Sequence, residues 1–292
     1  MKFKNLVLLL CLFVTLGKAQ SLNRIANDLD VVIDSYGSLS PFSEVIRRES
    51  ISLDFLEILE KSGGRLPDSI DPWLLIESAQ YLMDSLFYKL FYHLDFLNHR
   101  PEDVLNIQPT LVSSDGRFYQ YSFDENTGGS YRSQIVYYHY RAADGSVINS
   151  VNESDENSVL ANDGYYEIHN LPDSLGQPRY LLSGGVFGCN TCLQEYLDLL
   201  RYDTKEKHFV SDFSLSIADR GFGSLINIQA DADTNITVNY FYSDLNEGCD
   251  CESEELVEYY QQKCFQLYRY KNFNFHLAES RSWYGENILE DE

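Results

Sequence analysis

The stretch Val112–Tyr140, VSSDGRFYQYSFDENTGGSYRSQIVYYHY, marks the place where the periodicity of the chain changes. Before it, apolar residues recur every three or four positions, as they do on the buried face of an α-helix. From Leu111 onward the period is two, and aromatic and β-branched residues dominate, which is typical of strands. The sequence therefore predicts an α+β fold: an N-terminal helical region followed by an antiparallel all-β domain that is sandwich- or barrel-like.

The first 20 residues have the pattern of a signal peptide. Lys2 and Lys4 precede the apolar run Leu6–Leu16, which ends in the small-residue stretch 17–20. The run is too short to span a bilayer, which takes about 20 residues. We expect cleavage after Ala19 or Gln20, a secreted or periplasmic location, and no integral membrane segment in the mature chain. The predicted domains are a signal peptide at 1–20, a helical region at 21–106, and a β-domain at 107–292 with an acidic C-terminal tail.

Three helices are predicted in the helical region. Apolar spacing favours a helix over 22–36, which stops at Gly37, and a second helix from Pro41 to about Lys61. Asp71 is an N-cap residue type and Pro72 suits the first helical position, so a third helix begins there. This third helix is apolar nearly all round and should be buried on most sides. Its polar stripe consists of Glu77, Gln80, Asp84, Tyr88 and Asp95.

Short strands at hairpin spacing fill the rest of the chain. No helix is expected between them, apart from a short acidic excursion at 252–262, so the pairing should be antiparallel. The segment Tyr196–Tyr202 also has helical spacing, but the turn at 203–207 and the strand-like residues after it favour a hairpin. The predicted strands are 118–123, 134–140, 165–170, 179–183, 196–202, 208–215, 225–230, 236–242, 265–270 and 273–277.

The chain is strongly acidic. Its 45 Asp and Glu residues outnumber 22 Lys and Arg residues, which gives a formal net charge of −23. Such a chain repels nucleic-acid phosphates and anionic lipid surfaces, so no nucleic-acid partner is expected. Solubility outside the cytoplasm explains the charge more simply than attraction to cations or basic partners does.

The cysteines favour disulfides over metal or redox sites. Of the six, Cys11 lies in the signal peptide, so five remain, and an exported chain meets oxidising conditions. Zinc bound by the C-x-x-C and C-x-C pairs, or redox chemistry at the C-x-x-C, remain alternatives. The preferred single bridge joins Cys251 to Cys264. The candidate disulfide residues are Cys189, Cys192, Cys249, Cys251 and Cys264.

No catalytic, cofactor-binding or metal-binding motif stands out. The six histidines lack ligand spacing, and neither a nucleophile elbow nor a phosphate-binding loop occurs. Two loops, Asp124–Gly128 and Asp231–Asn235, open like calcium loops but lack the later ligands that such loops need. We therefore expect no cofactor, no metal and no catalytic residue.

The aromatic content, 22 Tyr and 17 Phe, allows two interpretations. Tyrosine suits a position with one apolar and one wet end, so the simpler interpretation is a β-core with tyrosines at its rim. The functional one is that strand tyrosines stack on sugar rings or on a protein partner. The candidate ligand-facing residues are Tyr137, Tyr138, Tyr140, Tyr240, Tyr242, Tyr268 and Tyr270.

One segment of the opening stretch resembles a known pattern. Ser114-Asp115-Gly116-Arg117, Tyr121-Ser122-Phe123-Asp124 and Thr127-Gly128-Gly129-Ser130 are similar to a motif in a group of secreted bacterial proteins of unassigned activity. In that group the motif lies between a helical N-terminal region and a β-rich domain. Tryptophan and threonine are usual there in place of Phe123 and Ser130. The resemblance covers about twenty residues and implies a domain boundary but no chemistry.

These observations favour a non-enzymatic exported protein, a binding or cell-envelope accessory module with a protein or glycan partner. The alternative is a secreted hydrolase that uses a carboxylate pair. With 45 acidic residues, the sequence offers too many such pairs to single one out.

Overall fold

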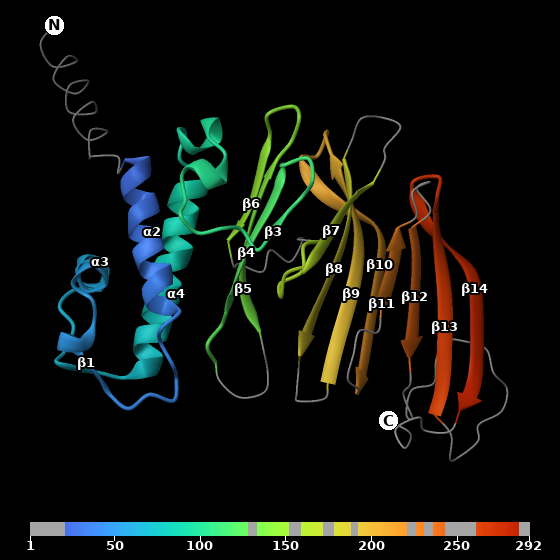
Figure 1. Ribbon diagram of the computed structural model, residues 1–292. Helices are drawn as coiled ribbons and strands as arrows, with labels where there is room; N and C mark the ends of the chain where they lie inside the picture. The colour runs from blue at the N-terminus through green and yellow to red at the C-terminus, as the bar shows by residue number, and fades with distance from the viewer. Residues whose placement is uncertain are drawn as a thin grey trace, which may run out of the picture. The chain divides into compact units, whose positions relative to one another are not determined.

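The structure is a computed structural model that describes residues 21–127, 133–151, 159–171, 178–187, 192–220, 226–230, 236–242 and 261–285 (Figure 1). The chain divides into a helical unit that ends at Gln108 and a β unit that begins at Pro109. The described helices lie in the helical unit, and the β unit consists of antiparallel sheets. The predicted α+β class is therefore confirmed.

The helical unit contains α2 (Leu22–Tyr36), α3 (Leu53–Gly63) and α4 (Pro72–Phe91). As predicted, α2 ends before Gly37, and α4 begins after Asp71. The Asp71 carboxylate accepts a hydrogen bond from the Trp73 backbone N–H at 2.9 Å, which satisfies one of the unpaired donors of the first turn. The shorter elements are β1 (Ile46–Arg47), β2 (Ser69–Ile70), η1 (Arg48–Ser50), η2 (Phe96–Asn98) and η3 (Pro101–Asp103).

The prediction of a helix from Pro41 to Lys61 is wrong in its first half. The helix α3 begins only at Leu53, after Ser52, whose hydroxyl accepts a hydrogen bond from the Phe55 backbone N–H. Upstream, Ile46 lies on β1, which pairs with β2 and places Ile46 opposite Ile70. An N-cap and a strand pairing therefore outweigh an apolar spacing that would also suit a helix.

Helix α4 is buried on one face, not on most sides as expected. The residues that pack against the rest of the helical unit, such as Leu75, Ala79 and Met83, have almost no exposed surface. On the opposite face, large side chains stay accessible, and Tyr81 is 71% exposed. The many apolar residues of α4 therefore predicted more burial than the described part of the helical unit provides.

The β unit consists of three four-stranded antiparallel sheets among the described strands, which do not close into one barrel. Their orders are β3-β4-β5-β6, β10-β9-β8-β7 and β11-β12-β13-β14. The ambiguous segment 196–202 lies within β9, so the choice of strand over helix is confirmed. The strands are β3 (Leu111–Val112), β4 (Phe118–Asp124), β5 (Gln134–Arg141), β6 (Val147–Val151), β7 (Glu167–Leu171), β8 (Arg179–Phe187), β9 (Cys192–Asp203), β10 (His208–Arg220), β11 (Ile226–Ala230), β12 (Ile236–Tyr242), β13 (Gln261–Lys271) and β14 (Asn274–Gly285).

Two glycine turns connect strands of the first sheet. Gly116, between β3 and β4, has φ 65°, and Gly145, between β5 and β6, has φ 82°. Both angles lie in the left-handed region, where glycine has no steric penalty. Three predicted features lie outside the described residues: the glycine pair at 128–129, the second calcium-like loop at 231–235, and most of the acidic excursion, at 252–260.

Candidate functional site

The tyrosines of β5 lie in the protein interior. Tyr137, Tyr138 and Tyr140 are 0%, 3% and 1% exposed. The Tyr140 ring lies 5.2 Å from that of Tyr202 and 4.7 Å from that of Phe209, measured between centroids. This core cluster joins the first and second sheets. Such burial is the opposite of the accessible placement that ligand stacking requires.

The other candidate tyrosines lie on the third sheet. Tyr268 and Tyr270, on β13, are half-buried. They pack against a second core cluster, which includes Phe275, and the ring centroids of Tyr270 and Phe275 are 5.3 Å apart. Tyr240 and Tyr242 are on β12, and their side chains lie outside the described residues. The structure therefore does not bring the seven candidates together on one described surface.

Asp115, in the segment that carries the family resemblance, has a structural role. Its carboxylate accepts hydrogen bonds from the Ser113 hydroxyl at 2.5 Å and from the Tyr180 hydroxyl at 2.9 Å. Tyr180 is on β8, so this carboxylate connects the β3–β4 turn to the second sheet. The short polar motif is thereby explained as a turn and a contact between sheets.

A second polar contact between these sheets is centred on Tyr165. The Gln120 side chain accepts from the Tyr165 backbone N–H at 2.8 Å and donates to its carbonyl at 2.7 Å. The Tyr165 hydroxyl donates to Asp198 at 3.0 Å, and Ser214 donates to the same carboxylate at 2.7 Å. Burial raises the pKa of the Asp198 carboxyl above its usual value. Both carboxylate oxygens are thus engaged in contacts that hold strands together.

The cysteine predictions fall largely outside the described residues. Cys189, Cys249 and Cys251 are not described, and Cys192 and Cys264 are placed on β9 and β13 without described side chains. Within the described ranges, no group of three or more His, Cys, Asp or Glu residues could hold a metal ion.

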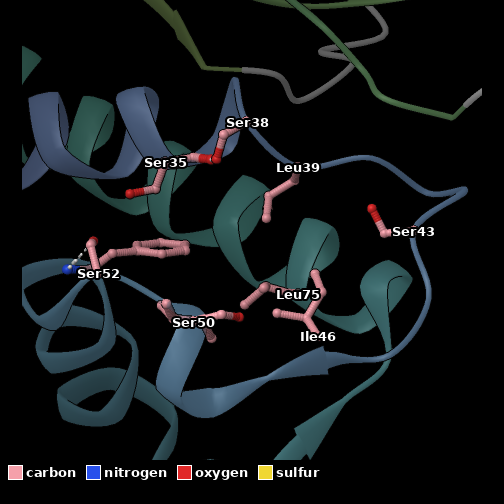
Figure 2. Close-up of a pocket in the computed structure, with 10 residues that line it drawn as sticks. Ser35, Ser38, Leu39, Ser43, Ile46, Ser50, Ser52 and Leu75 are labelled. Carbon is pink, nitrogen blue, oxygen red and sulfur yellow. Dashed lines mark hydrogen bonds between the residues drawn. The ribbon is translucent and has the colours of Figure 1, made fainter.

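A pocket of about 350 Å³ lies in the helical unit, between the end of α2 and the segment that leads into α3 (Figure 2). Leu39 points into it from one side, and Ile46 and Leu75 point toward Leu39 from the other (Figure 2). Phe55 and Leu75 are buried, so they form an apolar floor. We call this site the serine pocket; its lining residues are Ser35, Ser38, Leu39, Ser43, Ile46, Ser50, Ile51, Ser52, Phe55 and Leu75.

The serines that line the pocket are neutral hydrogen-bonding groups. The Ser38 hydroxyl donates to the Ser35 carbonyl at 2.6 Å, and the Ser50 hydroxyl donates to the Arg47 carbonyl at 2.7 Å. Each of these hydroxyl oxygens keeps lone pairs that can accept from a ligand. Ser52 uses its oxygen to cap α3, which leaves its hydroxyl hydrogen for another acceptor.

Sequence reasoning missed this pocket entirely. Its serines are spread over 18 positions, from Ser35 to Ser52, and form no spacing that any known chemistry requires. The only available signal was a serine-rich segment between two helices, which also describes an ordinary loop. The wrong placement of the second helix hid the site as well, because it put Ser43 and Ile46 within a helix that the structure does not have there.

No protein-family model, no curated protein and no protein of solved structure matches this chain. None of the described helices is long and apolar enough to cross a membrane. The function is therefore argued from the chemistry of the serine pocket.

Proposed function

We propose that this chain is an exported, non-enzymatic binding protein whose serine pocket holds a small neutral ligand. The ligand has an apolar part, which contacts Leu39, Phe55 and Leu75, and neutral hydrogen-bonding groups, which meet the serine hydroxyls. The signal-like residues 1–20 support export, and kinship with the secreted bacterial group that shares the segment 114–130 is part of the same proposal.

The observation that carries this proposal is the composition of the pocket lining. All ten lining residues are serine or apolar, although the chain has a formal net charge of −23 and 23% charged residues. Ligand pockets are typically apolar with a few placed polar groups and have volumes of about 300–1,000 Å³. A lining without charge favours a neutral ligand, because a buried ion without a partner costs several kcal/mol.

The hydrolase alternative has weaker support. It needs two carboxylates that flank a cleft, and no Asp or Glu lines the serine pocket. The buried carboxylate of Asp198 has a raised pKa, but its oxygens accept hydrogen bonds from Tyr165 and Ser214. These contacts favour a role in holding the sheets together over one in catalysis.

A titration with Nile red, a neutral apolar dye that fluoresces strongly in dry sites, tests the proposal. The variant Ile46→Trp fills the pocket, because the Ile46 side chain points into it (Figure 2). The matched control is Val45→Trp, which adds the same ring one position earlier, at a residue that is 61% exposed and does not line the pocket. Circular dichroism spectra of both variants show whether the helices stay intact.

We expect saturable binding of one dye per chain in the wild type and in Val45→Trp. In Ile46→Trp, the affinity should fall about tenfold or more, because the added ring occupies the volume that the dye needs. Equal binding by all three proteins, or no saturable binding by the wild type, would remove the support for a ligand site here.

A further inference from the structure

The short helix η1 and the helix α3 meet at one corner of the serine pocket. Only Ile51 and Ser52 separate the end of η1 from the start of α3. Two linking residues contribute four soft backbone dihedrals, so contacts further along the chain are needed to hold the angle between the two elements. Four of the lining residues lie at this corner: Ser50, Ile51, Ser52 and Phe55.

One carboxylate oxygen, Oε1 of Glu60, joins the two elements. It accepts hydrogen bonds from Arg48 Nε at 3.0 Å and from Arg48 Nη2 at 2.8 Å. Arg48 is the first residue of η1, and Glu60 lies near the end of α3, so the pair closes the corner from both of its arms. The two side chains are only 30% and 26% exposed, and salt screens such a pair less than a fully exposed one.

The same oxygen also holds the segment that follows α3. It accepts a third hydrogen bond, from the Leu66 backbone N–H at 3.2 Å. That segment leads into β2, which pairs with β1 immediately before η1. The Arg48 backbone N–H donates to the Asp68 carbonyl at 3.0 Å, just before β2 begins. Glu60 therefore connects η1, α3 and the approach to β2 in one closed set of contacts.

The negative charge of Glu60 strengthens these contacts. The hydrogen bonds from Arg48 hold the pKa of the Glu60 carboxyl below its usual value, and the positive charge of Arg65 acts in the same direction. The carboxyl is therefore ionised at neutral pH. Hydrogen bonds to an ionised acceptor are stronger than those to a neutral one. A neutral side chain of the same shape would thus hold Arg48 less firmly.

We propose that Glu60, which is not among the lining residues, positions the corner of the serine pocket through Arg48. The ion pair keeps the wall that carries Ser50 and Ile51 in place over the Phe55 floor, so the pocket is formed before a ligand enters. A preformed site binds more tightly, because the ligand does not have to order it. This inference rests on the proposed binding function, and it adds that the affinity for a neutral ligand depends on a charge pair outside the pocket.

The Nile red titration of the full mature chain tests this role with Glu60→Gln, which keeps the shape of the side chain and removes its charge. We expect the affinity to fall about three- to fivefold, the effect of losing a partly exposed ion pair. The matched control is Glu57→Gln, on the same helix, because Glu57 pairs with Lys61 of α3 and joins no second element. It should bind the dye as the wild type does. Circular dichroism verifies that both variants keep the helices.

Two further measurements separate positioning through Arg48 from a general loss of stability. Arg48→Met should lower the affinity by about the same factor, and the double variant with Glu60→Gln should lower it no further, because both changes remove one contact. Added sodium chloride should weaken dye binding by the wild type relative to Glu60→Gln, since salt screens the ion pair but not the contacts of a neutral dye.

The outcomes distinguish this role from the proposed function. If the wild type binds no dye, the ligand site is wrong and the positioning role with it. If the wild type, Glu60→Gln and Glu57→Gln bind equally, the ligand site stands and the positioning role is wrong. Additive losses in the double variant would overturn it too, because Glu60 and Arg48 would then act independently. In the ligand-free protein, the Ile51 methyl resonances should shift in Glu60→Gln and not in Glu57→Gln, and an unshifted Ile51 in Glu60→Gln would contradict the proposal whether or not the dye binds.

Discussion

Gln120 on β4 holds the backbone of Tyr165 with both ends of its amide, at 2.8 and 2.7 Å, and is only 1% exposed. Its removal would leave a buried N–H and a buried carbonyl without a partner. Each such loss costs about 1–3 kcal/mol, so Gln120→Leu should lower the free energy of unfolding by about 3 kcal/mol. Urea denaturation measures this change.

The control for Gln120 is Gln194→Leu. Gln194 is an exposed glutamine on β9 that donates a hydrogen bond to Ser216, and water can replace that contact. Its change should cost less than about 0.5 kcal/mol. Equal losses of unfolding free energy in the two variants would mean that the two hydrogen bonds from Gln120 to the Tyr165 backbone add no stability of their own.

His139 is the second residue that permits a quantitative prediction. Its Nδ1 is 2.6 Å from the Asn149 side-chain oxygen, and its Nε2 accepts from Arg141 Nε at 2.7 Å, which requires a neutral ring. Burial lowers the pKa of His139 from 6.5 to about 4. The unfolded chain therefore takes up a proton before the folded chain does, and stability is lost as the pH falls from 6.5 toward 4.

The pH dependence of unfolding checks this sign. Between pH 8 and pH 5, the His139 ring should account for a loss of about 2 kcal/mol in the free energy of unfolding. His139→Gln has no titrating ring, so its free energy of unfolding should fall by that much less over the same interval. Parallel pH profiles for the two proteins would show that the ring is not held in its neutral form.

The burial of β5 explains why its tyrosines were difficult to interpret from sequence. Apolar and polar residues alternate along a strand only when one of its faces meets water, so only then does the pattern identify the buried face. Residues Ile135 to Tyr140 are all buried, on both faces of β5. Aromatic residues at consecutive positions therefore indicated a strand correctly but carried no information about a ligand-facing side.

At the scale of elements, the strongly periodic segments were predictable and the ends set by a single contact were not. Helix α4 and strands β4, β5 and β12 lie where their caps, turns and alternation indicated. Helix α3 begins twelve residues later than predicted, because Ser52 and the β1–β2 pairing define its start. The serine pocket follows from that start, so it was predictable neither as a motif nor as a shape.

The turn between β13 and β14 contains unusual backbone. Asn272 and Phe273 have φ 53° and 65°, and a bulky side chain in that region is strained. Arg179 of β8 holds the turn, because its Nη1 donates to the Phe273 carbonyl at 2.7 Å and its guanidinium lies 5.5 Å from the centroid of the Phe273 ring. The strained backbone at this turn therefore places Phe273 in contact with Arg179 of the second sheet.

Two substitutions at Phe273 separate the strain from the ring contact. Phe273→Ala and Phe273→Gly both lose the ring, but only glycine relieves the strain, so the glycine variant should be more stable by about 1 kcal/mol. At Val112, on β3, the order should reverse, because glycine weakens an ordinary strand. Thermal or urea unfolding of the four variants measures both differences. If the alanine variant is more stable than the glycine variant at both positions, the backbone at Phe273 is not strained.

At the scale of the whole molecule, export predicts the state of the cysteines. If the proposed signal peptide is cleaved, Cys11 is lost and five of six cysteines remain, so we expect two disulfides and one free thiol. A thiol titration of the native mature protein should therefore find one reactive thiol per chain, and five after reduction in denaturant. Four thiols that become reactive only after a chelator is added would indicate zinc instead.

The central claim is that the helical unit of this chain binds a neutral ligand in the serine pocket. Methyl-labelled leucine and isoleucine, observed by NMR during a Nile red titration of the full mature chain, test it most directly. We predict progressive, saturable shifts for the methyl groups of Leu39, Ile46 and Leu75, and none for Leu181 and Leu199 in the core of the β unit. Shifts confined to the β unit, or no shift at the three pocket residues while the dye binds, would contradict the account.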